Sequence, residues 1–218
     1  MRQLVCDAVL FDLDGVLIDS TGCVTRHWTE WAGRHGLDIA AVMRIAHGLR
    51  PVDIMRLVAP HLDIEQEVER FTAAEVADTE GIVVIDGAAE LLAALPEDAW
   101  AVVTSGSAQL ATSRLRHAGL PVPATLVTAD DVQRGKPAPD PYLLGAARLG
   151  VPVDRCVAVE DAPAGIQAAR AAGMRVIGVA ATHSPEELCR STVVVERLSA
   201  LCVTADDGAG RGLAIRIG

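Results

Sequence analysis

The sequence predicts an α/β protein whose core is a doubly wound, Rossmann-like parallel sheet, with a small all-helical module inserted after the first strand. Short apolar strand patterns alternate with Ala-rich helical stretches over most of the chain. Gly119, Gly150 and Gly173 each follow such a stretch and precede a strand, as is typical of the residue after a helix C-terminus. Strands that alternate with helices favour a parallel sheet with helices on both faces.

The core elements are expected in the following order. A first strand is expected at Val5–Phe11, where an apolar run leads into an acidic turn. The later strands are expected at Ala99–Val103, Leu126–Val127, Cys156–Val159 and Val176–Val179. The helices between them are expected at residues 107–118, 140–149 and 163–172.

Residues from about 20 to 85 interrupt this alternation, because they read as helices without convincing strands. The first regular helix of the core follows at Gly87–Leu95. The helices of the insertion are expected at residues 22–35, 38–47, 51–59 and 64–79.

We therefore expect two domains: an α/β catalytic core formed by residues 1–16 and 87–218, and a helical domain formed by residues 17–86. Two chain crossings, near residues 16–20 and 83–87, would let the helical domain hinge over a site. Helices packed rigidly onto the sheet are the alternative. The segment 184–212 has no pattern that places its elements.

Composition is that of a globular enzyme with an acidic surface. The chain has 218 residues, of which 50% are hydrophobic, and a formal net charge of -10. Such a charge argues against a nucleic-acid partner, which requires a basic face. The five cysteines lack any CxxC spacing and are expected to be free thiols in a reducing compartment. With no apolar run long enough to span a bilayer, we expect a cytoplasmic protein without membrane contact, and a monomer by default.

Two carboxylates, Asp12 and Asp14, directly follow the first strand in the stretch Phe-Asp-Leu-Asp-Gly. Ionised acids at this spacing repel one another unless a cation or a shared proton compensates them. Gly15 allows a sharp turn, which can bring the backbone close to a small anion. The pair is therefore the first candidate for catalysis, and a strand-end turn set by Asp14 and Gly15 alone is the structural alternative.

Two later segments carry groups that can bind an anion. Thr104 and Ser105 follow the second core strand just before a helix, whose first N–H groups and dipole attract negative charge. A plain helix cap is the alternative for Thr104. Lys136 lies between Gly135 and two prolines, in a loop that would hold its charge in place. An exposed lysine in a proline-rich turn is the alternative there.

A second acidic pair, Glu160 and Asp161, ends the strand expected at Cys156–Val159. Asp161 could simply cap the helix that follows. However, the carboxyl ends of parallel strands face one crevice, so this pair would meet Asp12 and Asp14 there. Four carboxylates together require a cation. Oxygen ligands without a nearby His or Cys favour Mg²⁺, which keeps several waters and shares a substrate phosphate.

Together these segments resemble the four motifs of the haloacid-dehalogenase (HAD) superfamily of phosphohydrolases, and they occur in the same order. The helical domain has the position of that superfamily's cap. Three stretches, Ala46–Asp53, Gly135–Pro139 and Glu160–Ile166, are similar to the glycerol phosphatase and 2-deoxyglucose-6-phosphatase group. The resemblance covers nearly the whole chain. It implies a Mg²⁺-dependent phosphatase that hydrolyses a small sugar or polyol phosphate monoester through an aspartyl-phosphate intermediate.

The resemblance also implies a role for each motif residue. Asp12 would be the nucleophile that attacks phosphorus. Asp14 would protonate the leaving alkoxide as a general acid and then deprotonate water as a general base. Lys136 and Thr104, with backbone N–H groups near Ser105, would bind the phosphoryl oxygens as charge redistributes.

The implied ligands of Mg²⁺ are the side chains of Asp12 and Asp161 and the backbone carbonyl of Asp14. Glu160 would bind the ion directly or lie next to its ligands. These assignments make a small phosphate ester the expected partner of the chain.

Substrate specificity is expected to come from the cap. There the resemblance implies that His47 and Arg50, in a His-Gly-Leu-Arg turn, face the substrate. A cationic Arg50 could bind hydroxyls or a second anionic group. An ordinary helix-end histidine is the alternative for His47.

Three other functions remain open at this stage. A sugar phosphomutase of the same superfamily is the nearest, but those mutases carry a histidine shortly after the first motif, where this chain has Val24. A dehalogenase is disfavoured because Asp14 would have no task in halide displacement. A non-catalytic sugar-phosphate-binding protein would be a different class, yet all the groups that turnover requires are present.

Overall fold

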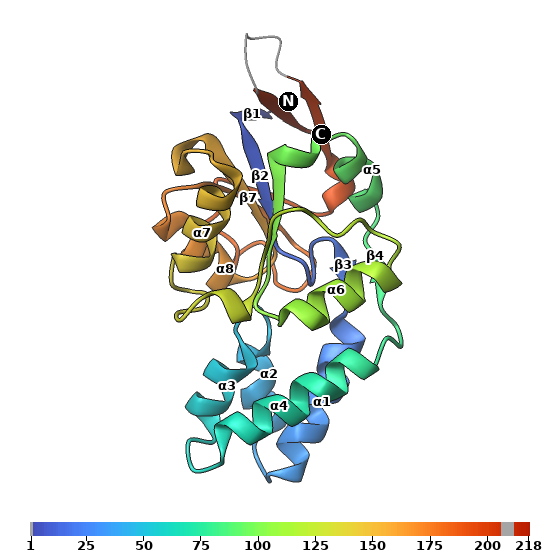
Figure 1. Cartoon of the computed structure of the whole chain (residues 1–218), viewed down its shortest axis with the longest axis vertical. Coiled ribbons are helices and arrows are strands. Elements are labelled where there is room, and N and C mark those ends of the chain that lie inside the picture. Colours follow the sequence, from blue (N-terminus) through green and yellow to red (C-terminus); the bar gives the residue numbers. More distant parts are fainter. Residues whose placement is uncertain (1, 206–211) are drawn as a thin grey trace.

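The computed structural model describes residues 2–205 and 212–218, and its centre is a six-stranded parallel sheet (Figure 1). The strand order is β6-β5-β2-β7-β8-β9, so β2 is an interior strand between β5 and β7. Their parallel pairing aligns the carboxyl ends of these three strands at one edge. The strands are β2 (Ala8–Phe11), β5 (Trp100–Val103), β6 (Leu126–Val127), β7 (Cys156–Glu160), β8 (Arg175–Val179) and β9 (Val193–Val195).

Helices cover both faces of this sheet, which confirms the predicted doubly wound fold. Because side chains alternate along a strand, Val9 and Phe11 face one core while Ala8 and Leu10 face the other. Helices α5 (Ala88–Ala93) and α6 (Ala108–His117) pack on the first core, and α7 (Asp140–Leu149) and α8 (Pro163–Ala171) on the second. Short 3₁₀ helices lie at Glu97–Ala99, Ala129–Asp131, Val153–Arg155 and Leu198–Ala200.

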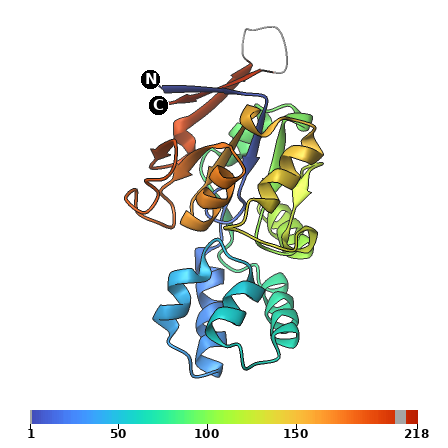
Figure 2. The same ribbon diagram turned by 90° about the vertical axis from the view of Figure 1, so that its left-hand side faces the viewer.

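Four helices form a separate layer beyond the carboxyl edge of the sheet (Figure 2). They are α1 (Thr21–Arg34), α2 (Ile39–Ala46), α3 (Pro51–Val58) and α4 (Ile64–Ala77), within two residues of the bounds expected from the sequence. Asp38 and Asp63 cap α2 and α4, and Pro51 opens α3, where its missing N–H is tolerated. The layer has its own apolar core, formed by residues that include Trp28, Trp31, Ile54, Met55 and Phe71.

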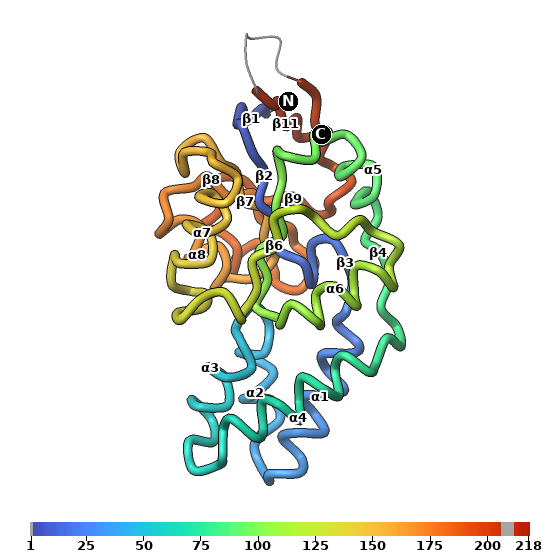
Figure 3. Tube along the Cα trace, in the orientation of Figure 1, coloured from blue at the N-terminus to red at the C-terminus, as the bar shows by residue number. Residues whose placement is uncertain are grey.

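The two connections between this helical layer and the sheet run side by side (Figure 3). Strand β3 (Ile18–Asp19) pairs antiparallel with β4 (Val83–Val84), and Ile85 N–H donates to the Leu17 carbonyl at 3.0 Å. The sequence does not predict this pair, because two-residue strands have too short a pattern to detect.

The chain ends also differ from expectation. The single strand expected at Val5–Phe11 is broken at Asp7, whose carboxylate binds Arg155 at 2.6 and 2.8 Å. The part before Asp7 is β1 (Arg2–Cys6), which joins β11 (Leu213–Ile217) and β10 (Leu201–Ala205) in a small antiparallel sheet. Residues of β1 are largely exposed whereas those of β2 are buried, so residues 5–11, expected as one strand, lie in two different environments.

Within the segment 184–212, β9, β10 and the last 3₁₀ helix are the regular elements between residues 184 and 205, and residues 206–211 lie outside the described residues. In the described parts of the chain, no helix combines the length and the apolar character that crossing a membrane requires.

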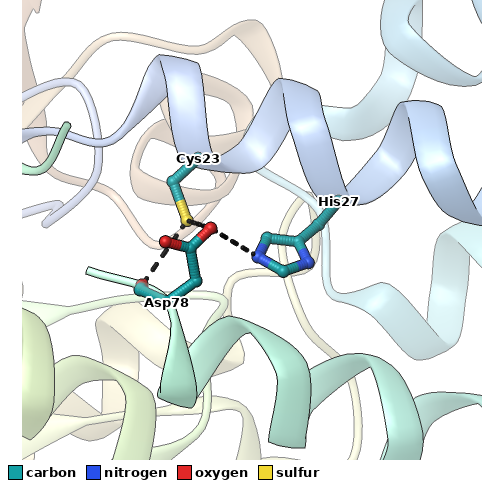
Figure 4. Close-up of side chains that lie close together, drawn as sticks. All are labelled: Cys23, His27 and Asp78. Carbon is teal, nitrogen blue, oxygen red and sulfur yellow. Dashed lines mark hydrogen bonds and ion pairs between the residues drawn. The ribbon is translucent and has the colours of Figure 1, made fainter. Parts of the chain in front are cut away.

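Asp78, which ends α4, links the last helix of the layer to the first (Figure 4). Its Oδ2 atom accepts from Arg26 Nη2 at 2.7 Å and lies 3.0 Å from His27 Nε2, while the Cys23 thiol lies 3.7 Å away. Oδ1 accepts from the Glu80 N–H at 2.9 Å. The hydrogen bond from Arg26, followed by the one from Glu80, lowers the pKa of Asp78 below its ordinary value. The ionised side chain therefore stabilises the junction of α1 and α4.

We expect Asp78→Asn to lower the free energy of unfolding at neutral pH by about 1–3 kcal/mol, because it removes a charge that accepts several hydrogen bonds. Urea unfolding followed by circular dichroism measures the change. Glu30→Gln is the control, since Glu30 is exposed on the same layer and forms an exposed ion pair with Arg34 at 3.4 Å; it should change stability by less than about 0.5 kcal/mol. Equal losses in the two variants would contradict a special role for Asp78.

Candidate active site

A pocket lies between the carboxyl edge of the sheet and the helical layer. The turns after four strands contribute to it: Asp12 follows β2, Thr104 follows β5, Asp161 follows β7 and Thr182 comes after β8. The helical layer contributes side chains from α1 and α4 and the His47–Leu49 turn. The topology therefore brings together residues that are far apart in the sequence.

Three carboxylates, Asp12, Glu160 and Asp161, form a buried cluster at this edge. Each is at most 4% exposed, and one oxygen from each lies within 4.8 Å of the other two. Lys136 Nζ donates to Asp12 Oδ1 at 2.8 Å and to Glu160 Oε1 at 2.6 Å. Tyr142 also donates to Glu160 Oε1, at 2.6 Å. The lysine and tyrosine thus fix Glu160 behind the two acids that reach the pocket.

The charges of this cluster do not balance. Burial alone would lower the pKa of Lys136, but Asp12 and Glu160 raise it above its ordinary value, so the ammonium stays charged. Burial raises the pKa of Asp12 to about 7, against the opposing effect of Lys136 and with a smaller contribution from Glu160. Burial, followed by Asp12 and Glu160, raises the pKa of Asp161. One ammonium therefore does not compensate three carboxylates. A set of oxygen donors with too little positive charge nearby fits a hard divalent cation.

The turn after β2 brings the backbone against Asp161. Gly15 has a φ of 82°, a conformation that residues with a Cβ rarely adopt. A Cβ at this position would overlap the Asp161 carboxylate, which also accepts a hydrogen bond from the Thr182 hydroxyl. Glycine is therefore required here for close approach as well as for the turn.

Asp14 lies apart from the buried cluster. Its side chain is 28% exposed and lines the pocket. Oδ1 accepts from the Ser20 hydroxyl at 2.6 Å and from Arg114 Nη1 at 2.7 Å. The two acids of the first motif thus have different surroundings, although one residue separates them.

Thr104 and Ser105 both line the pocket, as expected from the sequence. Thr104 Oγ1 accepts from the Gly106 N–H at 3.1 Å, so this hydroxyl also stabilises its own turn. Ser105 Oγ donates to the Gly48 carbonyl at 2.8 Å and so links the sheet to the helical layer. Ser107, rather than Thr104, caps α6.

Of the two residues of the helical layer that were expected to face the substrate, one lines the pocket and the other does not. His47 lines the pocket, where burial, followed by His183, lowers its pKa. The structure does not bring Arg50 into the pocket. Its guanidinium binds Asp53 at 2.7 Å and the carbonyls of Val132 and Gln133 at 2.9 and 3.0 Å.

Arg50 therefore connects the helical layer to the loop that carries Lys136. A Cβ on Gly135 would overlap the Arg50 side chain, which explains the glycine beside that lysine.

Several residues at the site were not predicted from the sequence. Tyr142 binds Glu160, and Arg114 binds both Asp14 and Glu75. Both lie within helices, Tyr142 in the first turn of α7 and Arg114 in the second half of α6, where nothing in the pattern distinguishes them from packing residues. Thr182 could have been found, because it follows the carboxyl end of β8, where ligands of such sheets bind.

A parallel sheet with buried carboxylates and a lysine at its carboxyl edge defines an α/β enzyme, and the chain is similar to known hydrolases. The family model for haloacid dehalogenase-like hydrolases matches residues 6–173. Hexitol phosphatase A from Escherichia coli (strain K12) is 44% identical over 204 residues, which cover 91% of this chain and 94% of that protein. Glycerol-1-phosphate phosphohydrolase 2 from Saccharomyces cerevisiae (strain ATCC 204508 / S288c) is 37% identical over 192 residues, covering 83% and 77%.

The similarity extends to solved structures. A hydrolase from Pseudomonas syringae superposes with a TM-score of 0.80 at 28% identity, covering 88% of this chain and 94% of that one. The chain therefore belongs to the haloacid dehalogenase-like hydrolases, which confirms the resemblance seen in its motifs.

We expect Lys136→Met to destabilise the protein when no divalent cation is present, because it leaves Asp12 and Glu160 buried without a cation. The loss should be about 3 kcal/mol at about pH 8. It should be smaller at about pH 5, because an acid with a raised pKa takes up a proton in the folded state and its penalty therefore grows as pH rises.

Urea unfolding at the two pH values, in the presence of a chelator, measures this difference. Arg134→Met is the matched control, since Arg134 lies in the same loop with a side chain that is 72% exposed. A loss in Lys136→Met that did not change with pH would contradict the electrostatic explanation.

Proposed function

We propose that the chain is a Mg²⁺-dependent phosphatase that hydrolyses a small sugar or polyol phosphate monoester through an aspartyl-phosphate intermediate. The observation that carries the proposal is the placement of Asp12. Its carboxylate lines the pocket, is bound by Lys136 on one oxygen, and lies within ligand distance of Asp161. A carboxylate held in this way can act as a nucleophile toward phosphorus.

In the proposed mechanism Asp12 attacks the phosphorus. Lys136 holds Oδ1, so that Oδ2, which has no hydrogen bond from the described residues, can form the new bond. Lys136 would also offset the negative charge that gathers when a phosphoryl group arrives. The hydroxyl of Thr104 and the N–H groups near Ser105 would bind the remaining phosphoryl oxygens.

Asp14 is proposed as the general acid and base. It lines the same pocket two residues from the nucleophile. It would give a proton to the leaving alkoxide and then take one from the water that hydrolyses the intermediate. Its partial exposure suits a group that must exchange a proton with each turnover.

Asp12 and Asp161 would hold Mg²⁺ with their side chains and Asp14 with its backbone carbonyl, while Glu160 would act through Lys136. The ion supplies positive charge that allows an anionic carboxylate to approach an anionic phosphate. The uncompensated carboxylates described above support this assignment.

The helical domain, residues 17–86, is proposed as a cap that closes over the core, residues 1–16 and 87–218. Its own apolar core and its two adjacent connections support this division. The names of the relatives, hexitol phosphatase and glycerol-1-phosphate phosphohydrolase, support a polyol phosphate as substrate. His47, whose lowered pKa favours the neutral ring, would bind a hydroxyl group of this substrate. Arg50 would keep the cap in place rather than contact the substrate.

We also propose a cytoplasmic monomer that acts on a free small molecule. The five cysteines are free thiols, and three of them are buried, which suits a reducing compartment. A phosphomutase is disfavoured because Val24, which lines the pocket, cannot transfer a proton.

The test is a screen for phosphate release from hexitol, glycerol, pentitol and hexose phosphates in the presence of Mg²⁺. Phosphate release that is fastest with a polyol phosphate is expected. Isomerised sugar phosphate without net phosphate would indicate a mutase, and binding without either product would indicate a sensor; both results would overturn the proposal.

We expect Asp12→Asn to lower turnover by at least about 10⁴-fold, because the amide cannot act as the nucleophile. Chelation of divalent cations should abolish turnover of the unchanged protein, and added Mg²⁺ should restore it. Asp154→Asn, an exposed carboxylate remote from the pocket, is the control and should keep full activity. Near-normal rates in Asp12→Asn would assign the nucleophile elsewhere.

A further inference from the structure

Arg114 is a buried cation that the mechanism above does not use. It lies on α6 in the core and is only 2% exposed, yet its guanidinium reaches two carboxylates from different parts of the chain. Nη1 donates to Asp14 Oδ1 at 2.7 Å, and Nη2 donates to Glu75 Oε1 at 3.1 Å. Glu75 belongs to α4 of the helical layer and is itself 5% exposed. All three side chains line the pocket.

The two carboxylates keep this guanidinium in one orientation. A buried cation is tolerated when it is paired and hydrogen-bonded, and here one planar fork is shared between two acids. Nε has no hydrogen-bond partner among the described residues, so Nη1 and Nη2 make the hydrogen bonds to the two carboxylates, and the Cys23 thiol also interacts with the guanidinium. Moving either carboxylate would change how Arg114 holds the other.

The contact gives the two oxygens of the Asp14 carboxyl group different surroundings. Oδ1 already accepts two hydrogen bonds, from Arg114 and from Ser20 at 2.6 Å. Oδ2 has none from the described residues. The two hydrogen bonds therefore fix the orientation of this carboxyl group in the pocket.

We propose that Arg114 is a positioning residue that fixes the orientation of the Asp14 carboxyl group through Oδ1, and that Glu75 makes this arrangement depend on the position of the helical layer. The proposal rests on the proposed role of Asp14 as general acid. When α4 packs on α6, Arg114 is shared between Glu75 and Asp14, and the Asp14 carboxyl group is held in one orientation. Displacement of α4 moves Glu75 away from Arg114. The guanidinium then binds Asp14 alone and is no longer held in one orientation by two carboxylates.

The test compares two esters, a hexitol phosphate and 4-nitrophenyl phosphate. The alkoxide of the first must be protonated as it leaves, whereas 4-nitrophenolate departs without a proton. The quantity measured is kcat/KM, because it includes only the steps up to departure of the alcohol and excludes the later hydrolysis of the phosphoenzyme. Asp14→Asn defines the signature of a lost general acid: a large loss with the hexitol ester and a small one with the nitrophenyl ester.

We expect Arg114→Gln to show this signature, with a loss of about 100-fold for the hexitol phosphate and less than about threefold for 4-nitrophenyl phosphate. Arg114→Lys keeps the charge but not the fork, so it should recover part of the loss. Glu75→Gln should show the same selectivity, with a loss of about tenfold for the hexitol phosphate. Because it keeps the shape of the side chain, this variant also tests the inference if Arg114→Gln does not fold. Arg116→Gln is the matched control, because Arg116 is exposed on the same helix and should leave both values unchanged.

Equal losses for the two esters in the folded Arg114 and Glu75 variants would show a merely structural role and overturn the inference. An unchanged kcat/KM for the hexitol phosphate in Glu75→Gln would overturn the proposed link between Asp14 and the helical layer. If Asp14→Asn shows the signature and the Arg114 variants do not, the inference fails while the proposed function stands. If Asp14→Asn itself lacks the signature, the proposed role of Asp14 fails first.

Discussion

The structure depends on one buried ammonium group among three buried carboxylates. Lys136 reaches Asp12 on the strand turn at the centre of the sheet and Glu160 at the end of the neighbouring strand, and each of these groups is almost fully excluded from water. Burying such charges without partners would cost far more free energy than a domain has available. The turns after β2 and β7 and the Lys136 loop must therefore converge, and this requirement explains the glycines where neighbouring side chains leave no room for a Cβ.

The sheet topology supplies this convergence, which is why most of the fold was predictable. Strand patterns near Asp12, Thr104 and Glu160 indicated parallel strands, and parallel strands release their carboxyl ends at one edge. The strand pair β3 and β4 and the split between β1 and β2 were not predictable, because β3 and β1 form through pairing with the distant segments β4 and β11. The local sequence of a strand does not indicate which distant strand will pair with it.

The site was predictable to the same extent and for the same reason. Residues at strand ends, such as Asp12 and Asp161, are marked by their place in the pattern and lie in the pocket. Arg50 was expected to face the substrate from its turn, but its direction depends on carbonyl groups of the Lys136 loop, 82 and 83 residues away. Arg114, Tyr142 and Glu75 lie within helices whose periodicity only marks them as inward-facing. The role of such a buried polar residue can be recognised only when its partner from a distant part of the chain is known.

The two acids of the first motif show how such partners give identical side chains different surroundings. Asp12 is 4% exposed and bound to the ammonium of Lys136, which belongs to the core. Asp14 is 28% exposed on its side chain and bound to Ser20 at the connection and to Arg114, which also binds the layer. Attack on phosphorus and protonation of the leaving group belong to one step, so both acids have to be in place once the site has closed. Asp14 is the one of the two whose carboxylate binds a side chain that also binds α4, so its orientation is the one that a movement of the helical layer would change directly.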